Sequence, residues 1–111
     1  FNLFIFFEIN SFKMSTSAVH NKANSIMNKK LCNFIANKFL RAFKDKEGNK
    51  ISQNKYAKYC GLSSSTISKM KSEDGYDLPI STIYNICRHE RYSLNDFFSE
   101  FENLYGENLP L

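Results

Sequence analysis

Residues 51–72 constrain the fold of this chain more than any other segment. Ser52 stands before a short amphipathic stretch, where its hydroxyl oxygen can accept a hydrogen bond from a free amide of a first helical turn. Gly61 follows this stretch and suits the left-handed backbone that ends many helices. Ser63 can cap a second helix in the same way as Ser52. The segment therefore predicts two short helices joined by a tight turn, over about 53–60 and 64–72.

Small and apolar residues occupy the positions that two helices need when they cross at a sharp angle. Ala57 provides a small side chain where the second helix would cross the first. Ile67 and Met70 are three residues apart and share one face of the second helix. Tyr56, Cys60 and Leu62 would fill the wedge between the helices. The residues expected to hold this pair of helices together are Ala57, Gly61, Leu62, Ile67 and Met70.

This pattern resembles the Cro/repressor-like (XRE-type) helix-turn-helix family of DNA-binding domains. The resemblance covers about residues 29–105 and depends on the joint spacing of Ile51-Ser52-Gln53, Ala57, Gly61-Leu62-Ser63, Thr66-Ile67-Ser68, Pro79, Ile83 and Ser93-Leu94. It implies a compact, all-α domain of five helices that binds double-stranded DNA. The alternative interpretation is an ordinary helical hairpin that binds no DNA.

The helix expected over about 64–72 is the candidate reading helix, the one that would enter the major groove. When Ile67 faces inward, steps of 100° per residue turn Ser65, Ser68, Lys69 and Ser72 outward. Lys69 should be the strongest reader, because its ammonium can donate to guanine O6 and N7 whereas short serines reach less far. The resemblance implies base contacts by Ser64, Ser65, Ser68 and Lys69, and phosphate contacts by Gln53, Lys55, Thr66, Lys71 and Ser72. It also implies that Gln53 braces the reading helix.

Charge is distributed unevenly along the chain, whose net charge is +4. Residues 29–72 hold eleven basic and two acidic residues, whereas residues 73–111 hold two basic and eight acidic ones. A basic region can attract a polyanion, and its coincidence with the helix pair favours DNA over a merely solvated surface. The acidic segment 73–79 departs from the family pattern, which puts in doubt any DNA-backbone contact there.

The remaining helices are expected over 29–45, from Pro79-Ile-Ser81 to about His89, and over about 95–104. Gly48-Asn49 should end the first, Ser81 should cap the next, and Asn95 or Ser93 should cap the last. His89 is interpreted as an exposed residue at a helix end rather than a titratable switch. The last helix carries an aromatic stripe that either closes the core alone or also forms a dimer face. The candidate residues of this face are Phe97, Phe98, Phe101, Leu104 and Tyr105.

The ends of the chain are interpreted as extensions of this domain. Residues 1–13 hold five phenylalanines before the first methionine, Met14, and are expected to be translated upstream sequence. The alternative is a short strand that associates with a membrane or docks in a dimer; the segment is a poor signal peptide, because it is short and lacks a basic leader. Residues 14–28 are polar and are expected to form a flexible arm, and 106–111 a tail.

The expected function is that of a sequence-specific transcriptional regulator, most simply a repressor, which binds double-stranded DNA without a cofactor. The three cysteines lack the spacing of a disulfide framework or a zinc site, which favours a cytoplasmic protein. The expected DNA binding would make it nucleoid-associated. The alternative is an antitoxin-like module that grips a protein partner with its C-terminal half and binds DNA for autoregulation. We do not expect an enzyme; the only hint of one is a nuclease-like acidic cluster of Glu73, Asp74 and Asp77.

Overall fold

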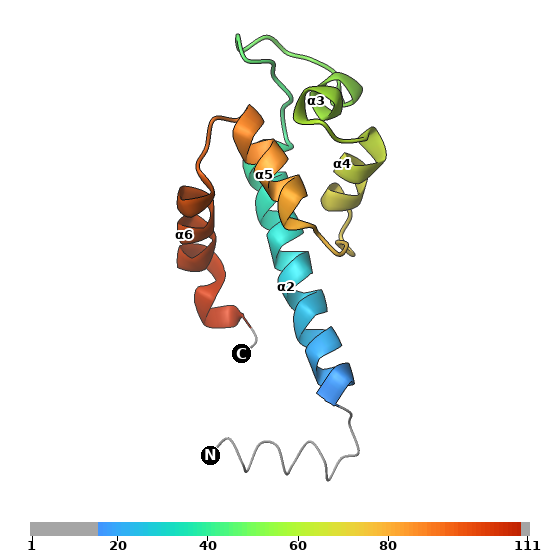
Figure 1. Cartoon of the computed structure of the whole chain (residues 1–111), viewed down its shortest axis with the longest axis vertical. Helices are drawn as coiled ribbons and strands as arrows, with labels where there is room; N and C mark the ends of the chain where they lie inside the picture. Colours follow the sequence, from blue (N-terminus) through green and yellow to red (C-terminus); the bar gives the residue numbers. More distant parts are fainter. Residues whose placement is uncertain (1–15, 110–111) are drawn as a thin grey trace.

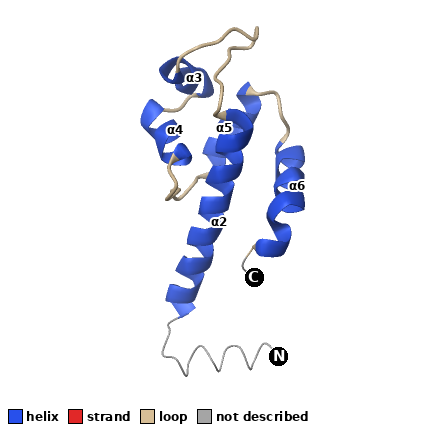
Figure 2. Cartoon of the chain, turned by 180° about the vertical axis from the view of Figure 1, so that it is seen from behind, coloured by secondary structure: helices blue, strands red, loops and turns tan. Residues whose placement is uncertain are grey.

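The computed structural model describes residues 16–109, and these fold into a compact arrangement of helices (Figure 1). In both views α5 overlaps the upper half of α2, with α3 and α4 on one side and α6 on the other (Figures 1 and 2); α2 packs against α4 and α6, and α5 packs against α3 and α6. This arrangement confirms the all-α fold predicted from the sequence. The elements are α2 (Thr16–Phe39), α3 (Gln53–Cys60), α4 (Ser64–Lys71), α5 (Ile80–His89), α6 (Leu94–Tyr105) and the short 3-10 helix η1 (Gly106–Asn108).

Helix α2 differs from the prediction at both ends. It begins at Thr16 rather than at residue 29, so the described part of the expected arm, 16–28, is helical. Neither glycine nor proline interrupts this segment, and half-buried apolar residues continue the helical spacing from Val19 to Met27, which packs on the core. The expected extension 1–13 lies outside the described residues.

The first helix also ends earlier than Gly48-Asn49, because the chain turns back on itself after α2. Lys44 and Lys50 form an antiparallel bridge, and the Asp45 carboxylate accepts from the backbone N–H of Asn49 at 2.8 Å. This bond is the main reason why the pKa of Asp45 is lowered. Gly48 adopts a φ of 86° within the turn, a value that few other residues tolerate. The glycine therefore serves this loop and not a helix end.

The buried core takes residues from each helix from α2 to α6, and it contains aromatic residues that were candidates for a dimer face. Phe97 is fully buried and Phe101 is 2% exposed, and both rings contact Phe34, with centroids 5.1 and 5.6 Å apart. The prediction that these two residues could line a dimer face is wrong, because phenylalanines of α2 already cover them. Leu104 is 62% exposed, and Phe98 and Tyr105 are half-buried against the core.

Two predicted details around α5 are also wrong. Pro79 occupies the N-cap position of α5 and no side chain caps this helix, so Ser81 lies inside the helix rather than before it. His89 is only 8% exposed, because it packs edge-to-face on Tyr56 and bonds the Lys44 carbonyl oxygen at 3.1 Å. The returning loop after α2 provides this carbonyl, and the sequence pattern did not reveal the loop. At α6, Ser93 is the cap, one of the two residues predicted.

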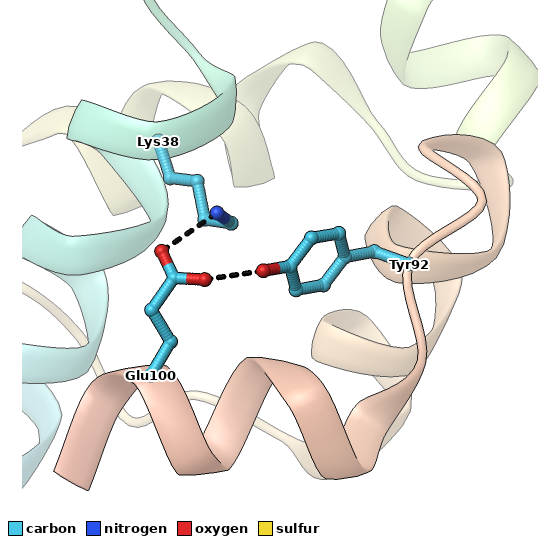
Figure 3. A network of polar contacts seen from close by, with 3 residues as sticks. All are labelled: Lys38, Tyr92 and Glu100. Atoms are coloured by element: carbon cyan, nitrogen blue, oxygen red, sulfur yellow. Dashed lines mark hydrogen bonds and ion pairs between the residues drawn. The ribbon is translucent and has the colours of Figure 1, made fainter. Parts of the chain in front are cut away.

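A polar cluster joins α2 to α6 beside this core (Figure 3). The Lys38 ammonium donates to one oxygen of the Glu100 carboxylate at 2.8 Å, and the Tyr92 hydroxyl donates to the other. The Lys38 ammonium also lies 4.3 Å from the centre of the Tyr92 ring. The hydrogen bond from Lys38 is the largest cause of the lowered pKa of Glu100. The cluster therefore stabilises the ionised carboxylate in the folded chain.

We expect Glu100→Gln to reduce stability at neutral pH and to have less effect in acid. Since the folded-state pKa of Glu100 is lowered, its contribution is present above the ordinary glutamate pKa, about 4.3, and is lost as pH falls through the folded value. Urea unfolding of both proteins from pH 7 to pH 3 measures this difference. The effect should be small and should weaken with salt, because the carboxylate side chain is 39% exposed. A difference that grows toward low pH would contradict this prediction.

Among the described residues, no helix is both long enough and apolar enough to cross a membrane.

Candidate nucleic-acid interface

Helices α3 and α4 form the pair predicted from the sequence, with both caps in place. The Ser52 hydroxyl accepts from the Lys55 backbone N–H at 3.1 Å, and the Ser63 hydroxyl accepts from that of Thr66 at 3.2 Å. Gly61 has a φ of 74°, the left-handed conformation expected for it. Gly61 therefore ends α3 in a backbone conformation that would strain a residue with a side chain, although the space around it is open.

The wedge between the two helices is closed by the predicted residues. Ala57 and Ile67 are buried where the helices approach each other, and Met70 is buried one turn further along α4. The Tyr56 hydroxyl donates to the Glu90 carboxylate at 2.6 Å and so ties α3 to the end of α5. Burial is the main cause that raises the pKa of Tyr56. These contacts hold α4 in a fixed position on the rest of the domain.

The outer face of α4, which we define as Ser64, Ser65, Ser68, Lys69 and Ser72, includes every residue predicted to contact bases. Four of the five are exposed, and Ser64 is half-buried. Within the described part of the chain, the Lys69 ammonium forms no hydrogen bond or ion pair. Its ammonium is therefore available to a ligand. In both views, α6 lies on the opposite side of α2 and α5 from α4, so the acidic C-terminal helix does not cover this face (Figures 1 and 2).

Gln53 connects the start of α3 to α4. Its side-chain nitrogen lies 2.9 Å from the Ser68 hydroxyl oxygen and 3.1 Å from that of Ser64. It also donates to the Ser64 carbonyl oxygen at 3.2 Å. Gln53 thus occupies the bracing position that the resemblance implies, while a phosphate contact by this residue stays a prediction.

Basic side chains surround the pair of helices on the side of α3. Lys50, Lys55 and Lys58 line an open hollow beside the start of α3, together with Ile51, Ser52 and Asn54. Lys71 takes a different position: its ammonium lies 5.2 Å from the centre of the Phe43 ring and 3.5 Å from the side-chain oxygen of Gln53. Of the predicted phosphate contacts, Lys55 and Ser72 are exposed, whereas Thr66 is half-buried and bonds the Ser63 hydroxyl at 2.9 Å.

The acidic loop after α4 packs on α2 rather than on α4. Asn28 donates to the Asp77 carboxylate at 3.3 Å, and a side chain at Gly75 would meet the Lys29 backbone at 3.1 Å. Tyr76 is half-buried against the core. Asp74 and Asp77 line a polar hollow with asparagines of α2. Among residues 16–109, no group of three or more histidine, cysteine, aspartate and glutamate side chains is placed to hold a metal ion.

Two features of this region were missed by sequence reasoning. The returning loop 44–50 packs beside α3, and its only signal was the turn-forming Asp45 to Asn49 segment. The hydrogen bonds from Gln53 to two serines had no signal in the sequence beyond the resemblance.

In comparisons with family models, curated proteins and solved structures, no match to this chain was found.

Proposed function

We propose that this chain is a sequence-specific double-stranded DNA-binding protein of the Cro/repressor-like type, and that it regulates transcription by occupying its site. Helix α4 would enter the major groove, and α3 with its lysines would rest on the phosphates. The observation that carries this proposal is the outer face of α4, which is polar, exposed and rigidly supported on a buried wedge. A short supported helix of this kind fits the width of the major groove.

Electrostatics supports the same orientation. The helix pair carries Lys55, Lys58, Lys69 and Lys71 and no acidic residue between 51 and 72. Cations on this surface would displace counterions from the phosphates and supply affinity that does not depend on sequence. The serines and Lys69 on the outer face of α4 would then supply the sequence-dependent part.

The antitoxin-like alternative has weaker support. It needs aromatic residues of the C-terminal half to contact a partner, but Phe97 and Phe101 are buried within the domain. Apolar side chains that are well exposed there include Ile80, Tyr84 and Leu104, which provide a smaller surface. A dimer formed through α6 could not use these two phenylalanines as contact residues either, because they are buried. Two copies bound to adjacent half-sites would still place their reading helices about 34 Å apart, one turn of duplex.

Selection of bound duplexes from a random pool tests the proposal directly. We expect enrichment of a defined sequence and a steep loss of affinity with salt, by about 10³-fold or more between 50 and 200 mM if six or more phosphates are contacted. A duplex of scrambled sequence serves as the control for specificity. Failure to enrich any sequence, or an affinity that does not change with salt, would contradict DNA binding in this mode.

A further inference from the structure

Gln53 has a fixed orientation, which the chemistry of its neighbours sets. Its side-chain nitrogen lies 3.2 Å from the carbonyl oxygen of Ser64, which can only accept a hydrogen bond. Its side-chain oxygen lies 3.5 Å from the Lys71 ammonium, which can only donate. Both neighbours select the same orientation of the amide, so its N–H groups point toward α4.

This orientation determines how the Ser68 hydroxyl can act. The oxygen of Ser68 lies 2.9 Å from the side-chain nitrogen of Gln53 and must accept from it. A hydroxyl that accepts in this way still has its own hydrogen to donate. Within residues 16–109 the Ser68 hydroxyl forms no other hydrogen bond, and the side chain is exposed. Its hydrogen is therefore directed to solvent or to a ligand on the outer face of α4.

The other side chains on this face either donate hydrogen bonds or already take part in them within the chain. The Ser64 hydroxyl oxygen lies 3.1 Å from the Gln53 side-chain nitrogen, whose two hydrogens it shares with two other oxygens, and the Ser72 hydroxyl oxygen accepts from the Asp74 backbone N–H at 3.3 Å. Lys69 has donors only. Ser65 is bonded to the Ser63 hydroxyl at 3.0 Å, an interaction in which either oxygen can donate. The outer face of α4 thus offers the donors of Lys69 and of the Ser68 hydroxyl, while the Ser68 and Ser72 oxygens each already accept one hydrogen bond within the chain.

We propose that this face recognises guanine in the major groove, with the Ser68 hydroxyl and the Lys69 ammonium donating to N7 and O6. Guanine presents two acceptors side by side there. Adenine presents one acceptor and one donor, cytosine a donor, and thymine one acceptor beside a methyl group. A face of donors therefore fits guanine best. This inference rests on the proposed DNA binding and specifies its target, with Gln53 as the positioning residue.

Base analogues in the duplexes enriched from the random pool test this assignment. Replacing guanine by 7-deazaguanine at the enriched positions removes the N7 acceptor and should weaken binding about tenfold, within the range known for single base contacts. The same replacement of adenine by 7-deazaadenine in that site should change affinity little. Selection of a site without a shared guanine, or equal binding after the guanine replacement, would overturn the assignment while leaving DNA binding intact.

Variants separate the roles of Ser68 and Gln53. Repeating the selection with Ser68→Ala should relax the guanine preference at one position, whereas Ser99→Ala, which changes an exposed serine on α6, should retain it. Gln53→Ala removes the amide that orients the Ser68 hydroxyl, so the guanine preference at the position read by Ser68 should weaken. An unchanged base preference in both Ser68→Ala and Gln53→Ala would overturn the assignment. If the unaltered protein enriches no duplex, the proposed function itself fails.

Discussion

Replacing Lys69 by alanine should weaken binding to the selected duplex by roughly 1–3 kcal/mol, which corresponds to about 5- to 150-fold. Lys69 is exposed on the outer face of α4, and its charge is not paired within the described chain. Its removal leaves an acceptor on the base without a partner, so most of the loss should appear on the selected site. Titrations against the selected and scrambled duplexes at one salt concentration measure both values.

Two other lysines provide matched controls for this experiment. Lys55→Ala, at an exposed residue predicted to contact phosphate, should reduce affinity for both duplexes by a similar factor, because a phosphate contact carries no sequence information. Lys22→Ala changes an exposed lysine on the projecting half of α2 and should alter neither value appreciably. Equal losses on both duplexes for Lys69→Ala would show that Lys69 contacts a phosphate. Lys69 would then not be one of the residues that contact bases.

Phe97→Ala should destabilise the domain by about 3–5 kcal/mol, the usual range for removal of a buried phenylalanine. The ring is fully buried, and its centroid lies 5.1 Å from that of Phe34 and 5.0 Å from that of Phe98. Small domains have a total stability of about 5–15 kcal/mol, so this variant could be largely unfolded at physiological temperature. Urea unfolding followed by circular dichroism measures the change.

Leu104→Ala is the control for Phe97→Ala, because this residue of α6 is 62% exposed. Its replacement should change the free energy of unfolding by less than about 0.5 kcal/mol, as expected for a surface position. Similar effects of the two substitutions would contradict the division of α6 into a buried and an exposed face. A loss in Leu104→Ala that depends on protein concentration would instead indicate a dimer.

The helix pair was predictable because its signals are local. Caps at Ser52 and Ser63, the glycine at 61 and the inward spacing of Ile67 and Met70 each depend on residues a few positions apart, and the structure contains all of them. The exposed face of α4 followed from the same spacing. A short helix whose inward residues are known has only one possible outer face.

The errors concern features that depend on distant residues. Phe97 and Phe101 form a stripe that suits either a core or a dimer, and only the position of Phe34 on α2 decides between these. His89 is buried because the carbonyl of Lys44, far away in the chain, reaches it. The start of α2 was missed since polar residues in a helix lower its amphipathic signal without preventing the helix.

The three cysteines have a practical consequence. Cys32, Cys60 and Cys87 are all buried and free, and they belong to α2, α3 and α5. Burial is the main cause that raises the pKa of Cys60 and of Cys87 to about 11, so both thiols are protonated and unreactive in the folded chain. An alkylating reagent can therefore modify them only when the surrounding helix opens. The labelling rate of each cysteine would therefore report how often the helix that contains it opens locally.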